Sequence, residues 1–215
     1  EIAGLLPSAG WVLIAWAIGG FLALAGALTY GELGAAYPYA GGNYVFLKEA
    51  YGPLVAFLYG WAFVLVTSTG TVALLAIGFA EQVGLPKDGS STQMLALGAV
   101  VVLTFLNYIG VKFGAGVTNA ITFAKIVAMA ALIGLGVTIG HGHPENFQNA
   151  LTPPNADVWT GIGAALVPMA FAYSGWNATV FVSEEVKNPQ RNIPLSLLVG
   201  TLLTSAIYVL MNFIY

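Results

Sequence analysis

Cysteine is absent from the sequence, and charged residues make up only 7% of its 215 residues. Without cysteine, the chain has neither disulfides nor thiolate metal ligands. The scarcity of charge, together with 58% hydrophobic residues, is typical of membrane proteins and not of soluble domains. A signal peptide is not expected, because no basic segment precedes the first apolar run and that run is too long. We therefore treat every apolar run as a candidate membrane helix.

Charged residues are so sparse that they divide the sequence into apolar runs. Helices that cross a bilayer need about 20 apolar residues. The sequence therefore predicts an all-α membrane protein with six transmembrane helices. Their expected ranges are about 9–32, 53–82, 92–108, 116–139, 158–183 and 192–215.

The basic residues predict the orientation of the chain, since cytoplasmic loops carry an excess of lysine and arginine. Alternate loops place Lys87 on one side and all the other loop cations on the opposite side. The cytoplasmic loops are then 33–52, 109–115 and 184–192, and residue 1 lies outside. Because the sequence starts at Glu1 and ends within an apolar run, we expect it to be a piece of a longer polypeptide.

The helix expected over 158–183 contains a candidate break near 174–175. Ser174 and Gly175 lie among the aromatic residues Phe171, Tyr173 and Trp176. Glycine lowers helix propensity by about 1 kcal/mol relative to alanine, and a break frees backbone groups that lipid cannot satisfy. From the residues alone, an ordinary glycine-containing helix packed on a neighbour is an equally good interpretation.

If the helix does break, its direction predicts what the break binds. The segment enters from outside, so its first half directs carbonyl groups at the bilayer centre and its second half directs amide groups there. A zwitterion fits such a junction. The carbonyls of Phe171 and Ala172 are candidates to accept an ammonium group, and the side chains of Phe171 and Trp176 are candidates to wall or gate the pocket.

Lys125 is the one charged residue expected deep in a membrane helix. It lies about ten residues into the helix, or about 15 Å from the start of that helix. A charge near the bilayer centre costs roughly 3 kcal/mol on insertion scales, and the lysine stem is too short to carry it to an interface. We therefore expect Lys125 to have a partner or a lowered pKa, and its role as a fixed cation or a proton carrier stays open.

Several functional classes are disfavoured by what the apolar runs lack. They contain no Asp or Glu between the expected helix ends, so no catalytic carboxylate pair or membrane metalloprotease site can be assembled. A channel would need polar rings from several helices, whereas only Thr67–Thr71 is rich in hydroxyls. His141 and His143 lack acidic neighbours at ligand spacing, so we predict no metal site and no cofactor.

Four separated stretches carry a resemblance to one family. They are GALTYGELGAAYPYAGGNYV at 26–45, AFLYGW at 56–61, FAYSGW at 171–176 and SEEVKNPQRNIP at 183–194. In this order they resemble amino-acid permeases of the amino acid–polyamine–organocation superfamily, especially the L-type amino acid transporter branch. The resemblance covers nearly the whole chain.

The resemblance implies a fold and a set of site residues. The chain would hold about the second to seventh helices of a LeuT-type transporter, which is built from two inverted repeats of five helices. Lys125 would occupy the place of a sodium ion in sodium-coupled relatives. A cytoplasmic gate would be formed by Glu184, Glu185, Lys187 and Arg191. The substrate-binding residues would be Phe171, Ala172, Tyr173, Ser174, Gly175, Trp176, Asn177 and Ser68.

The resemblance also implies a function. We expect a sodium-independent exchanger or a proton-linked carrier, not an enzyme, that moves amino acids across the plasma membrane by alternating access. Neutral substrates are favoured because no acidic residue lies near the break, and a cationic amino-acid or polyamine carrier is the alternative.

The expected partners are the amino acid, the lipid bilayer and the remainder of the transporter. We expect no nucleic acid, and the sequence does not indicate whether an accessory subunit exists. The glycine-rich segment that binds the substrate carboxylate in the family is absent from this sequence.

Overall fold

The computed structural model describes residues 2–86, 89–109, 111–139, 151 and 153–214. All regular elements among these residues are helical. Contacts group the chain into two units, and each unit is described by itself. The first unit consists of Glu1–Ala50 and Met129–Tyr215, and the second of Tyr51–Ala128.

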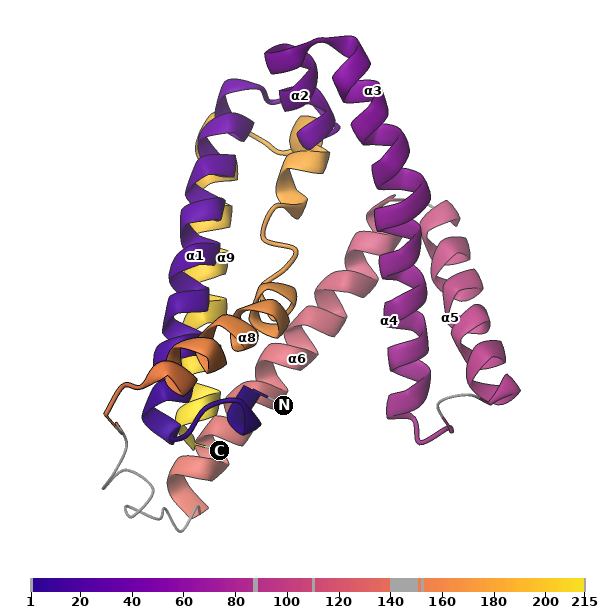
Figure 1. Cartoon of the computed structure of the whole chain (residues 1–215). Coiled ribbons are helices and arrows are strands. Elements are labelled where there is room, and N and C mark those ends of the chain that lie inside the picture. Colours follow the sequence, from indigo (N-terminus) through magenta and orange to yellow (C-terminus); the bar gives the residue numbers. More distant parts are fainter. Residues whose placement is uncertain (1, 87–88, 110, 140–150, 152, 215) are drawn as a thin grey trace. The chain divides into compact units, whose positions relative to one another are not determined.

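The first unit contains two long helices, α1 and α9, that lie side by side (Figure 1). Its elements are η1 (Ile2–Gly4), α1 (Ala9–Ala36), α2 (Asn43–Tyr51), the end of α6, α8 (Ala156–Ala172), η3 (Ala178–Glu185) and α9 (Pro189–Ile214). α1 packs along α9, and it also contacts α8 and η3. This helix therefore forms the centre of the unit.

Small residues let α1 and α9 approach closely. A Cβ atom on Gly20 would lie 2.8 Å from Ser205 Oγ, and one on Gly31 would lie 3.1 Å from the Cα of Pro194. Because residues later in α1 meet residues earlier in α9, the two helices are antiparallel. Close contact through small residues is the usual way in which membrane helices pack, since lipid provides no hydrophobic force between them.

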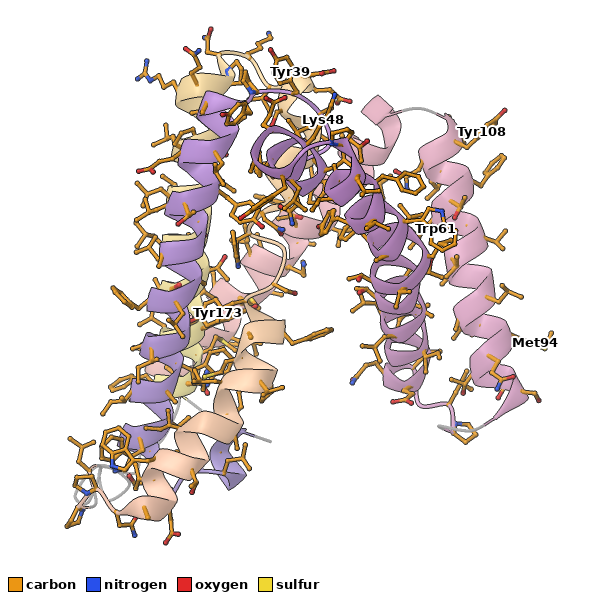
Figure 2. The ribbon with its side chains drawn as sticks, turned by 45° about the horizontal axis from the view of Figure 1, so that its top comes forward. Tyr39, Lys48, Trp61, Met94, Tyr108 and Tyr173 are labelled. Carbon is orange, nitrogen blue, oxygen red and sulfur yellow. The ribbon has the colours of Figure 1, made fainter. Side chains whose placement is uncertain are left out.

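The second unit contains α3 (Pro53–Ala62), η2 (Phe63–Ser68), α4 (Thr69–Gln82), α5 (Ser90–Ile109) and the greater part of α6 (Val111–Ile139). α4 and α5 pack together, and Thr92 Oγ1 donates a 2.7 Å hydrogen bond to the Pro86 carbonyl at the turn between them. Large apolar side chains such as Trp61 and Met94 are exposed on these helices (Figure 2). Such surfaces suit contact with lipid or with other membrane helices.

Five helices among the described residues are long and apolar enough to cross a membrane. They are Ala9–Ala36, Pro53–Gln82, Ser90–Ile109, Gly114–Thr138 and Pro189–Ile214, and Ala156–Ala172 is a shorter apolar helix. The shorter helix is the first half of the expected broken helix. The prediction of an all-α membrane protein with one broken helix is confirmed.

Away from the break, the structure differs from the expected elements in several places. Asn43–Tyr51, which lies within the cytoplasmic loop expected over 33–52, is helical. α6 starts at Val111, within the link expected over 109–115. The span Pro53–Gln82 contains a π-helical segment at Phe63–Ser68, beside which Thr69 Oγ1 donates to the Val64 carbonyl five residues earlier. π-segments of this kind are local features that composition does not reveal.

Candidate functional site at the broken helix

α8 is an α-helix with a defined start and end. It starts after Asn155, whose Oδ1 accepts a 3.0 Å hydrogen bond from the Val158 amide, and Asp157 adds an acidic side chain to the first turn. It ends at Ala172, where the Tyr173 amide donates to the Met169 carbonyl at 2.8 Å. The break therefore begins directly after Ala172, at Tyr173.

Gly175 makes the turn after α8 possible. Its φ of 96° lies in the region that favours glycine, because a Cβ atom there meets the backbone. The Gly175 carbonyl then accepts a 3.0 Å hydrogen bond from the Ala178 amide, which starts the next helical segment. The chain is consequently non-helical from Tyr173 to Asn177.

The segment after the break is a 3₁₀ helix instead of the expected α-helix. η3 runs from Ala178 to Glu185, and Val182 within it has non-helical backbone angles, φ −116° and ψ 26°. The β-branched residues Thr179, Val180 and Val182 disfavour an α-helix here. Val180 is buried against Ile193 of α9, so packing fixes this irregular segment.

Two cavities open on either side of the break. The first, of about 410 Å³, lies between the break and α9 and includes Ala172, Ser174, Thr201 and Tyr208 in its lining. The second, of about 460 Å³, lies between the break, α8 and α1. Tyr173, Ser174, Gly175 and Trp176 line both cavities, and Asn177 lines the second. The break thus separates two spaces large enough for a small molecule.

The two carbonyl groups expected to bind an ammonium group already accept hydrogen bonds, and the Phe171 carbonyl accepts the Tyr173 amide as well as the Ser174 amide. The Ser174 amide donates to the Phe171 carbonyl at 3.1 Å, and the Tyr208 hydroxyl donates to the Ala172 carbonyl at 3.0 Å. Since a carbonyl oxygen has two lone pairs, the Ala172 carbonyl, which has one described donor, has the capacity for a second. The carbonyl end of α8 therefore retains acceptor capacity at the cavity.

The aromatic residues of the break occupy different environments. Trp176 packs on α1, where a Cβ atom on Gly26 would lie 2.7 Å from its Cζ2 atom, and its ring stands edge-on to Tyr30 at 5.0 Å. Tyr173, labelled in Figure 2, is only 5% exposed. Its hydroxyl donates a 3.1 Å hydrogen bond to the Trp16 carbonyl. Phe171, in contrast, is 52% exposed and is absent from the described linings of both cavities.

Three residues near the break were not predicted from the sequence. Tyr208 bonds to Ala172, and Trp16 packs against Tyr173. Thr201 is 5% exposed, and its Oγ1 has no hydrogen-bond partner among the described residues. For Thr201 and Tyr208, the sequence did contain an indication. Their helical spacing with Leu197 and Thr204 places the four residues on one face of α9.

The remaining predicted site residues lie away from the break or in the other unit. Ser68 ends the π-helical segment, and Lys125 lies exposed within the α6 span. Both residues belong to the second unit, whereas the break belongs to the first. The gate candidates Glu184, Glu185, Lys187 and Arg191 are all exposed around the start of α9. Asn188, with φ 48°, turns the chain there, and its carbonyl accepts the Arg191 amide at 3.1 Å.

Within the described part of the chain, no group of three or more His, Asp or Glu side chains is placed to hold a metal ion. His141 and His143, considered above as a possible metal pair, lie outside the described residues.

Comparison with known proteins gives the family. The sequence profile described as "Amino acid permease" matches residues 2–215. The chain is 35% identical over 215 residues to the b(0,+)-type amino acid transporter 1 of Mus musculus, an alignment covering 97% of this chain and 44% of that protein. It is 34% identical over 203 residues to the serine/threonine exchanger SteT of Bacillus subtilis, covering 94% and 45% of the two chains.

A third relative is the large neutral amino acids transporter small subunit 2 of Homo sapiens, with 33% identity over 228 residues covering 99% of this chain and 42% of that protein. The chain therefore spans less than half the length of these curated relatives. The matched proteins are transporters by name, so the family is one of transporters and not of enzymes. This chain is a multi-pass membrane protein of the amino acid permease family, in the L-type amino acid transporter branch of the amino acid–polyamine–organocation superfamily.

Proposed function

We propose that the whole protein is a secondary active transporter that moves amino acids across the plasma membrane by alternating access. The observation that carries the proposal is the break at Tyr173–Asn177, where the carbonyl end of α8 meets two cavities. A zwitterionic ligand matches this arrangement, because carbonyl groups at a helix C-terminus attract cations. The names of the relatives, which include amino acid transporters and an exchanger, support the same class of cargo.

The substrate ammonium group binds to the carbonyls at the end of α8, principally that of Ala172. Trp176 forms a wall of the site, because it lines both cavities and is held on α1 by Gly26 and Tyr30. Ser174 and Asn177 supply further polar groups, and Phe171, which is exposed, acts as a movable gate. The carboxylate site lies on a part of the transporter that is outside this sequence.

Neutral amino acids are the proposed substrates. The described linings of both cavities include no acidic side chain that would neutralise a basic substrate. Burying a cationic side chain without such a partner is costly. A carrier of cationic amino acids or polyamines would need to draw its carboxylates from elsewhere in the protein.

Lys125 serves as a fixed cation in place of a sodium ion. It lies exposed in the α6 span Gly114–Thr138, where a charge needs a partner. Transport is then independent of sodium, as an exchanger or a proton-linked carrier. At the cytoplasmic end, Glu184, Glu185, Lys187 and Arg191 form the ion pairs of a gate when that side closes. Exposed pairs of this kind are individually weak, which suits a gate that must open.

Uptake by the full-length protein in liposomes tests the proposal. Labelled amino acid should enter in a saturable manner, with competition by neutral amino acids stronger than competition by cationic ones. Replacement of sodium by choline should leave the rate unchanged. Uptake that requires sodium would contradict the role proposed for Lys125, and preferential competition by lysine, arginine or polyamines would favour the cationic alternative.

A further inference from the structure

The carbonyl of Ala172 is held by a residue far away in the sequence. Ala172 is the last residue of α8, so its carbonyl belongs to the group that lacks partners within the helix. The Tyr208 hydroxyl, 36 residues further along and on α9, donates to it at 3.0 Å. The Phe171 carbonyl, in contrast, is bonded only locally in the described structure, by the Tyr173 and Ser174 amides. Tyr208 therefore connects α9 directly to the carbonyl end of α8.

The Tyr208 side chain is itself fixed by two other aromatic rings. Its ring stands edge-on to Trp16 at 5.2 Å and to Tyr173 at 5.1 Å, and Trp16 and Tyr173 are 5.9 Å apart. The Tyr173 hydroxyl donates to the Trp16 carbonyl at 3.1 Å. Edge-on pairs at such distances are the favoured geometry of aromatic side chains. The three rings, which come from α1, the break and α9, form an aromatic cluster that holds the Tyr208 hydroxyl in place.

This hydrogen bond lies at the wall of a cavity. Ala172 and Tyr208 both line the space of about 410 Å³ between the break and α9. One lone pair of the Ala172 carbonyl receives the Tyr208 hydroxyl, so the other remains for a second donor. A carbonyl whose direction is already fixed loses less freedom when a ligand binds. The geometry therefore preorganises an acceptor for a ligand N–H group.

We propose that Tyr208 is a positioning residue for the substrate: its hydroxyl orients the Ala172 carbonyl so that this carbonyl accepts the substrate ammonium. The inference rests on the proposed function, and it adds an α9 residue to a site otherwise built from the broken helix. Tyr208 acts through Ala172 and does not itself need to touch the substrate. Its removal should weaken binding of the amine without slowing the transport cycle.

The test replaces Tyr208 by phenylalanine in the full-length protein, reconstituted in liposomes. Tyr208→Phe keeps the ring and its aromatic contacts but removes the hydroxyl. The KM for a neutral amino acid should rise about 3- to 10-fold, the range expected for one hydrogen bond, while kcat stays within about 2-fold. Tyr108→Phe is the matched control, because this tyrosine is 87% exposed at the end of α5; its KM should equal that of the wild type.

Two further measurements separate positioning from general destabilisation. In detergent, the substrate concentration that half-saturates thermal stabilisation should rise in Tyr208→Phe by the same factor as KM. Inhibition by an analogue that keeps the carboxylate and side chain but lacks the amine should be unchanged. An unchanged or lowered KM, or an equal loss of affinity for the analogue without the amine, would overturn the inference. Absence of any amino-acid uptake by the wild type would instead overturn the proposed function.

Discussion

At the scale of single residues, the conformation of Gly175 is the feature on which the break depends. Its φ of 96° is strained for any residue with a Cβ atom, at a cost of about 1–2 kcal/mol or more. We expect Gly175→Leu to insert normally but to abolish uptake, because the turn after α8 can no longer form. Gly163→Leu is the matched control: it lies in α8 with open space around it. Insertion is measured as membrane expression, and transport as liposome uptake, for both variants. Normal uptake by Gly175→Leu would contradict a substrate site at the break.

Gly26 provides a second test at the same scale, since its lack of a side chain makes room for Trp176. A Cβ atom there would lie 2.7 Å from Trp176 Cζ2. Gly26→Ala should displace the indole ring, lower the thermal midpoint and raise the KM several-fold, because overpacking typically costs about 1–3 kcal/mol. Gly78→Ala, with nothing within 4 Å, should change neither quantity. Equal KM values for the two variants would exclude Trp176 as a wall of the site.

At the scale of elements, α8 depends on the cap at its start. The Asn155 Oδ1 atom accepts the Val158 amide at 3.0 Å. Asn155→Ala should destabilise the helix by about 1 kcal/mol and lower the thermal midpoint, whereas Asn155→Asp, which also caps, should retain it. Both variants should keep the wild-type KM, because the cap lies at the opposite end of α8 from the break. A change in KM equal to that of Tyr208→Phe would show that loosening α8 anywhere disturbs the site.

At the scale of the whole molecule, the predicted orientation is open to direct measurement. Single cysteines can replace Lys48, Lys87 or Lys187 in a full-length background without other cysteines; this sequence contains none. An impermeant thiol reagent applied to intact cells should label position 87 and should label positions 48 and 187 only after permeabilisation. Labelling in the reverse order would place residue 1 in the cytoplasm. The directions of the helix dipoles at the break would then be reversed as well.

Local chemistry explains why much of this protein was predictable from the sequence. The scarcity of charge delimits the membrane helices, since a charge in lipid is costly whatever surrounds it. Ser174 and Gly175 marked where a helix could break, because glycine acts on the backbone at its own position, although a continuous helix fitted the residues equally well. The type of helix that a short segment adopts depends on competing contacts of neighbouring residues, and it was not predictable. The 3₁₀ form of Ala178–Glu185 and the π-segment at Phe63–Ser68 are examples.

The sequence by itself determined that the chain crosses a membrane and about where its helices run, because these depend on composition. From the residues alone, the helix with Ser174 and Gly175 could be either broken or continuous. The tertiary structure decided which groups meet at the break. Tyr208 reaches the Ala172 carbonyl and Trp176 fits over Gly26 only because α1, α8 and α9 pack together. Such contacts join residues 36 to about 150 positions apart, and no local pattern encodes them.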